Sequence, residues 1–224
     1  MLALLLPVLL AVEVERVLAV VNGVPILASD VDLAEASQVV PHQPGEGDAA
    51  YRAAVVDALI ELELRWQDLE AAALTSRVQV DLDAAWSATV KRAGGTDALH
   101  DRLAALGLPE LTLRALVRRA AVVEAYVATR FAPFVRPSGA EVEKAWSDEL
   151  APQLRAAGKP VPELAAVRGQ VEALVRERKL SAEVERWTAE LAKRAEIVRY
   201  LPAPQASAVA ASPTPLATPP TSMP

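Results

Sequence analysis

Apolar residues recur three or four positions apart along much of the chain, and this spacing permits few folds. An α-helix has about 3.6 residues per turn, so the spacing gathers the apolar side chains on one helix face. In residues 48–74 that face contains Tyr51, Val55, Leu59, Leu62, Trp66, Leu69 and Ala73. Similar faces predict helices over 109–131 and 163–194. Because 52% of the residues are hydrophobic but only 4% aromatic, the apolar content is mostly Ala, Leu and Val. Ala and Leu favour helices, so we expect a mainly α fold.

Residues typical of helix ends divide the rest of the sequence into shorter helices. Ser29, with Asp32 three positions later, resembles a capping box that starts a helix ending near residue 40. Ser138 and Glu141 form a full capping box for a helix that ends near residue 156. Other predicted helix ends are the N-caps Asp81 and Thr96 and the left-handed C-cap Gly107. These boundaries predict about seven helices.

Two short runs near the start of the chain predict a β-hairpin. Residues 17–21 and 24–27 are rich in β-branched residues and flank Asn22-Gly23, the strongest two-residue hairpin signal. Pro25 restricts the second strand to a sheet edge. Since a two-stranded hairpin is marginal in water, a third strand should pair with it. The other strand-like run is 196–201, so we expect both ends of the ordered chain to meet in one small sheet.

The two ends of the sequence differ from the part between them. Residues 2–12 form an apolar run that is too short to span a bilayer and fits the core of a secretory signal. The alternative is a buried N-terminal strand of a cytosolic protein. Residues 202–224 are Pro, Ala, Ser and Thr with almost no charge, and we expect them to be disordered. The predicted organisation is a leader over 1–12, a domain over 16–201 and a tail over 202–224.

The composition argues against several functions. A net charge of −6 without a basic run argues against nucleic-acid binding. The absence of cysteine removes disulfides, thiol catalysis and zinc–thiolate sites. His42 and His100 lie far apart in sequence without other ligands at metal spacing, and Gly94-Gly95 lacks the Lys and Ser/Thr of a phosphate loop. We therefore expect no catalytic residue, metal or cofactor.

The order and spacing of these segments resemble the SurA family of periplasmic chaperones. Residues 17–32 (VLAVVNGVPILASDVD) are similar to the strand, turn, strand and helix start of that family. Residues 78–131 resemble its run of a Val-x-Val entry, a helix, a glycine break, a short helix that ends in Leu-Gly-Leu and a long helix containing arginine. Residues 191–201 (LAKRAEIVRYL) are similar to the basic helix end and last strand of the family. The resemblance covers nearly the whole of 16–201.

The chain departs from the family where members carry parvulin-type prolyl-isomerase domains. That position corresponds to residues 157–162, and a domain needs at least about 50 residues. We therefore expect no isomerase activity. The resemblance implies ATP-independent holding of unfolded outer-membrane or exported polypeptides in the periplasm. The alternative functions are a peptidyl-prolyl isomerase and a helical adaptor for one fixed partner. The alternative location is the cytoplasm.

Three aromatic residues are candidates for a client-binding groove. Phe131, Phe134 and Trp146 flank the connector before the helix that Ser138 starts. The alternative is that each of them is a core residue, because large rings at helical spacing are usually buried. The expected partners are unfolded polypeptides, with no nucleic acid and no stable membrane span.

Overall fold

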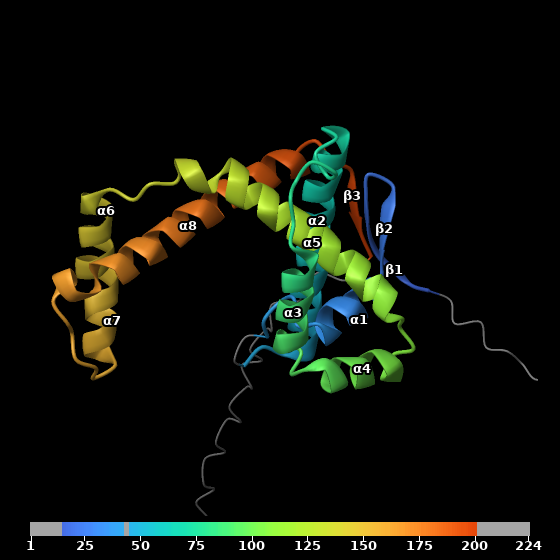
Figure 1. Ribbon diagram of the computed structural model, residues 1–224, viewed down its shortest axis with the longest axis horizontal. Helices are drawn as coiled ribbons and strands as arrows, with labels where there is room; N and C mark the ends of the chain where they lie inside the picture. Colours follow the sequence, from blue (N-terminus) through green and yellow to red (C-terminus); the bar gives the residue numbers. More distant parts are fainter. Residues whose placement is uncertain (1–14, 43–44, 201–224) are drawn as a thin grey trace, which may run out of the picture.

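The computed structural model describes residues 15–42 and 45–200, and these form an arch. A body at one end of the arch contains a small sheet and the helices of residues 28–130 (Figure 1). An arm at the other end contains the helices of residues 139–156 and the first part of the helix over 164–192, which runs from the arm to the body. The predicted leader and tail lie outside the described residues.

The described residues contain one three-stranded antiparallel sheet, as the sequence predicts. Its strands are β1 (Val17–Val21), β2 (Val24–Leu27) and β3 (Ile197–Arg199). Strand β1 lies in the centre, with β2 on one side and β3 on the other. Asn22 and Gly23 have φ angles of 49° and 83°, which is the left-handed region that this turn requires. Pro25 lies on the edge strand β2, where its missing N–H costs no ladder bond.

Helices make up most of the described chain and confirm the mainly α fold. They are α1 (Ala28–Ala36), α2 (Asp48–Ala71), α3 (Leu82–Arg92), α4 (Thr96–Ala105), α5 (Glu110–Arg130), the 3₁₀ helix η1 (Ala132–Phe134), α6 (Gly139–Lys144), the π-helix η2 (Ala145–Leu150), α7 (Ala151–Ala156) and α8 (Leu164–Ala192). Because α6, η2 and α7 follow one another without a gap, they form one continuous helical rod.

Several predicted helix ends are confirmed. The Ser138 hydroxyl accepts a hydrogen bond from the Glu141 N–H at 3.2 Å, and the Glu141 carboxylate accepts one from the Ser138 N–H at 2.7 Å. This is the full capping box. The Asp81 carboxylate accepts the Ala84 N–H at 2.9 Å at the start of α3. Gly107 has a φ of 66° just after α4 and provides the left-handed residue that ends it.

Two predicted N-caps are wrong. Helix α1 starts directly after β2 with Leu27 as its N-cap, and Asp30 accepts the Leu27 N–H at 2.9 Å. The helix therefore begins before Ser29, which lies in its first turn. Helix α4 has Gly95 as its N-cap, so Thr96 is the first helical residue. Gly95 has a φ of 111°, which glycine adopts far more easily than threonine. The glycine therefore takes the non-helical N-cap position, and the threonine becomes the first residue of the helix.

The body is built around α2, which contacts α1, α5, α8 and β1. Leu18 and Val21 of β1 pack with Val31 of α1, Val55 of α2 and Leu191 of α8 in one buried cluster. Each fully buried side chain of this size stabilises the fold by about 1.5–3 kcal/mol relative to leaving it exposed. Because Leu191 belongs to this cluster, the C-terminal part of α8 is anchored beside the N-terminal hairpin.

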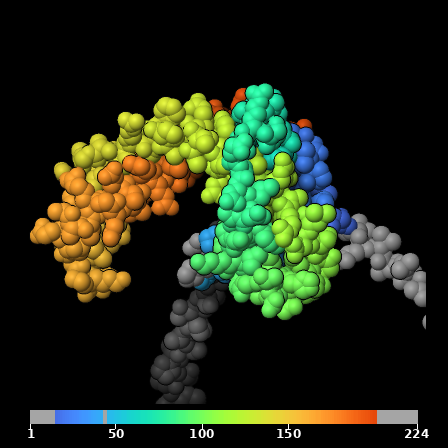
Figure 2. Space-filling view, viewed as in Figure 1, coloured from blue at the N-terminus to red at the C-terminus, as the bar shows by residue number. Residues whose placement is uncertain are grey.

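The arm has its own smaller core. Val142 and Ala145 of the α6–η2 rod pack against Val171 and Val175 of α8. The same helix reaches the body at Thr188, whose hydroxyl accepts a hydrogen bond from Arg65 Nε at 2.7 Å. Helix α8 therefore connects two separate apolar clusters. The space-filling view shows the arm and the body on either side of an open hollow (Figure 2).

Candidate peptide-binding site

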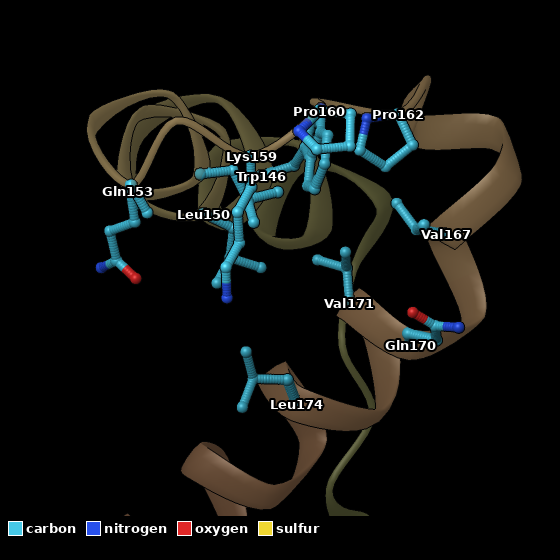
Figure 3. A pocket seen from close by; sticks show the side chains of 12 residues that line it. Trp146, Leu150, Gln153, Lys159, Pro160, Pro162, Val167, Gln170, Val171 and Leu174 are labelled. Carbon is cyan, nitrogen blue, oxygen red and sulfur yellow. The ribbon is translucent and has the colours of Figure 1, made fainter.

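A pocket of about 670 Å³ lies in the arm between the η2–α7 segment and the start of α8. Most of its lining is apolar (Figure 3). The lining residues are Trp146, Leu150, Gln153, Leu154, Ala157, Lys159, Pro160, Pro162, Val167, Gln170, Val171 and Leu174. An apolar concavity with a few polar groups is the usual form of a ligand site, and we call this one the arm pocket.

One wall of the arm pocket comes from an irregular turn. Pro152 has no N–H to donate to the carbonyl of Asp148, and its ring would clash with that carbonyl in a regular helix. The Ala151 N–H instead donates to the carbonyl of Trp146, five residues earlier. A π-helical turn of this kind is rare and frequently occurs at functional sites. Trp146 and Leu150 both lie on this turn and both line the pocket.

The opposite wall comes from α8 and the connector before it. Val167, Val171 and Leu174 are spaced by four and three residues, which places them on one face of α8. In Figure 3 these side chains lie across the pocket from Trp146 and Leu150. The rings of Pro160 and Pro162 line a further part of it. A proline has few backbone conformations to lose, so this part of the wall is stiff.

Ion pairs also connect the arm rod to α8. Lys179 Nζ lies 2.7 Å from Glu141, and Arg168 lies 3.2 Å from Glu143. The hydrogen bond from Lys179, together with those from Ser138, lowers the pKa of Glu141 to about 2. Exposed ion pairs of this kind are screened by water and contribute little to stability. The arm is therefore held mainly by its apolar core, with the ion pairs on its surface.

The three aromatic candidates occupy different places. Trp146 lines the arm pocket. Phe131 is half-buried where α5 meets α8, with its ring centroid 6.2 Å from that of Tyr126 and 5.4 Å from that of Trp187. Phe134 is 76% exposed on η1 and does not line the pocket. Of the three, the structure brings only Trp146 into the pocket, where its neighbours are aliphatic residues of the apolar stripes.

A polar network that is buried at Glu63 and exposed at Asn22 connects the sheet to the body helices. Glu63 of α2 is buried and forms an ion pair with Arg119 of α5. Gln67 donates to Glu63 at 2.7 Å and accepts a hydrogen bond from Asn22 Nδ2 at 2.8 Å. The Asn22 side-chain oxygen in turn accepts the Glu196 N–H at 2.8 Å. Asn22 therefore makes the turn and also connects the hairpin to α2 and to the segment before β3.

Over 15–42 and 45–200, no group of three or more His, Cys, Asp or Glu residues could hold a metal ion. The His42 ring lies 4.6 Å from the ring of Tyr51, and His100 is exposed on α4. In the same part of the chain no helix has the length and apolar character to cross a bilayer. The sequence matches no protein-family model, and no curated protein gives a significant match. Its function is therefore inferred from the arm pocket and the surfaces around it.

Proposed function

We propose that this protein is an ATP-independent chaperone that holds unfolded exported polypeptides at the arm pocket. The observation that carries the proposal is the large apolar concavity, which is lined from two sides and is separate from the core of the body. An unfolded chain exposes apolar side chains that a folded protein buries. The arm pocket offers such side chains a place out of water.

The lining favours weak holding of many different client sequences. Two or three client side chains buried there would contribute about 1.5–3 kcal/mol each. Association and ordering of a flexible chain cost at least about 4 kcal/mol, so the net affinity is low and the client dissociates readily. Aliphatic walls have no directional groups, which suits clients of different sequence. The charged surface of the arm keeps a loaded complex soluble.

The sequence supports the cellular context of this proposal. The apolar run at residues 2–12 favours export, and the resemblance of residues 16–201 to SurA chaperones favours a periplasmic role with outer-membrane clients. The connector between α7 and α8 covers residues 157–163, which is too short for an isomerase domain. The proposed function is therefore holding without prolyl isomerisation.

The test is suppression of aggregation with several unrelated denatured proteins. The protein should slow the light-scattering increase of each one, and Trp146→Ala should weaken this effect for all of them. Phe134→Ala is the matched control, because it removes an exposed ring outside the arm pocket. Equal activity of the Trp146 variant and the parent would contradict the proposed site. Activity toward a single protein would contradict general holding.

A second candidate function is an adaptor for one fixed partner. Leu82 and Trp86 of α3 and Leu111 of α5 line a groove on the body, and Leu111 is 76% exposed. The Arg114 guanidinium lies 3.9 Å from the centre of the Trp86 ring. Exposed apolar side chains beside arginine are typical of protein interfaces. An adaptor would capture one protein reproducibly, and Leu111→Ser would abolish that capture while Trp146→Ala would not.

A further inference from the structure

The arm pocket has one positive charge and no negative charge in its lining. Among the described residues that line it, Lys159 is the single charged one. No salt bridge or side-chain hydrogen bond of Lys159 occurs in the described part of the chain, although its backbone N–H donates to Leu154 at the end of α7. The nearest acidic residue in sequence, Glu163, does not line the pocket. The ammonium group is therefore available to a bound molecule.

Two neutral polar side chains accompany this charge. Gln153 of α7 and Gln170 of α8 line the pocket, and both present amide groups that can donate hydrogen bonds. In Figure 3 Gln153 and Gln170 lie on opposite sides of the pocket. The lining thus combines aliphatic and aromatic surface with donors, and it contains no carboxylate that would repel an anion.

We propose that Lys159 makes the arm pocket selective for an apolar side chain that lies next to a carboxylate. The inference rests on the proposed function and names the class of client segment that the site prefers. The apolar side chain packs against Trp146 and the aliphatic walls, and the carboxylate meets the Lys159 ammonium. A charge-assisted hydrogen bond is stronger than a neutral one, and because Lys159 is exposed, water screens it and the expected preference is a few fold.

Charge complementarity selects this occupant over others. The whole chain has a net charge of −6, so a general attraction for acidic peptides is not expected. A preference for a carboxylate would therefore come from the pocket itself. The occupant is an Asp or Glu side chain beside an apolar residue, because such pairs recur along an unfolded chain, whereas each chain has a single C-terminus.

The test measures binding of short labelled peptides to the full chain by fluorescence anisotropy. The probes are a peptide ending in Phe with a free carboxylate, the same peptide as its C-terminal amide, and amidated peptides with internal Phe-Asp or Phe-Asn. The Phe-Asp peptide should bind about two- to fivefold more tightly than the Phe-Asn peptide, and the free acid more tightly than its amide. In Lys159→Gln these ratios should fall to about one. Lys144→Gln, on the exposed side of the α6–η2–α7 rod, should keep them.

The outcomes separate this inference from the proposed function. Equal binding of the Phe-Asp and Phe-Asn peptides, with both weakened by Trp146→Ala, would overturn the carboxylate preference and leave the chaperone proposal intact. No binding of any probe would overturn both. Loss of the ratio in Lys144→Gln as well would show a diffuse charge effect and overturn the role of Lys159. Tighter binding of all probes after deletion of residues 202–224 would assign the pocket to the chain's own Pro-rich end, and this too would overturn the inference.

Discussion

Strand β3 closes the sheet, and replacing Val198 with proline tests how much this closure stabilises the protein. Val198 lies opposite Val20 in the antiparallel pairing of β3 with β1. On either side, the Tyr200 N–H donates to the Leu18 carbonyl at 2.9 Å and the Asn22 N–H donates to a carbonyl of the segment before β3 at 2.8 Å. Since hydrogen-bonded pairs alternate along an antiparallel ladder, the Val198 N–H points toward β1.

The expected loss follows from this geometry. Proline removes the ladder donor, which costs about 1–3 kcal/mol, and the restrained φ of its ring brings the expected loss to about 3 kcal/mol. The side chain itself contributes little, because Val198 is 37% exposed. For a chain of this size, 1 kcal/mol corresponds to about 2–4 °C, so Val198→Pro should lower the melting temperature by about 6–12 °C. Chemical denaturation followed by circular dichroism would measure the same loss as free energy.

Two controls isolate the backbone effect. Val198→Ala removes side-chain contacts and keeps the N–H, so it should cost far less than proline. Arg199→Pro changes a residue whose N–H points away from β1, and its effect should be close to that of Arg199→Ala, since both lose the ion pair with Asp57. If Val198→Pro melts like Val198→Ala, the closure of the sheet does not stabilise the domain and the reasoning fails.

Three further expectations concern the body, the arm and catalysis. Glu63→Ala leaves the Arg119 cation without its buried partner and should cost about 3 kcal/mol in chemical denaturation, whereas Glu61→Ala on the exposed face should cost below about 0.5 kcal/mol. Similar losses for both would contradict the role of the network. The low folded pKa of Glu141, about 2 against an ordinary 4.5, means that its ionised form stabilises the fold above pH 4.5 and that this contribution is lost as the pH falls toward 2. The difference in urea midpoint between the parent and Glu141→Gln should shrink over that range, and a constant difference would refute the pairing with Lys179. A proline-peptide assay should show no acceleration above background, and a concentration-dependent rate that survives repurification would contradict the absence of isomerase activity.

Local physical chemistry explains why much of the fold could be predicted. The two-residue turn needs left-handed residues, and Asn22 and Gly23 adopt that conformation easily. Pro25 cannot donate a ladder bond, so its strand must lie at an edge. Because a hairpin alone is marginal, a third strand pairs with β1, which is therefore the central strand. The apolar stripes predict the long helices for the same reason, because 3.6 residues per turn leave one face to bury. Where local signals compete, prediction was less reliable: Ser29 has good N-cap chemistry, but β2 continues directly into α1 and the helix begins earlier.

By itself the sequence determined the helices, the hairpin, the sheet edges and the apolar face of each helix. Only the tertiary structure decided which apolar residues meet at the arm pocket. Trp146 and Val171 come from helices separated by a connector, and periodicity assigns each to an apolar face without showing what covers that face. Phe131 and Phe134 are three residues apart, yet one packs against Trp187 and the other is exposed. Their difference depends on how α8 crosses the end of α5, and a crossing of two helices is set by long-range packing that no local pattern contains.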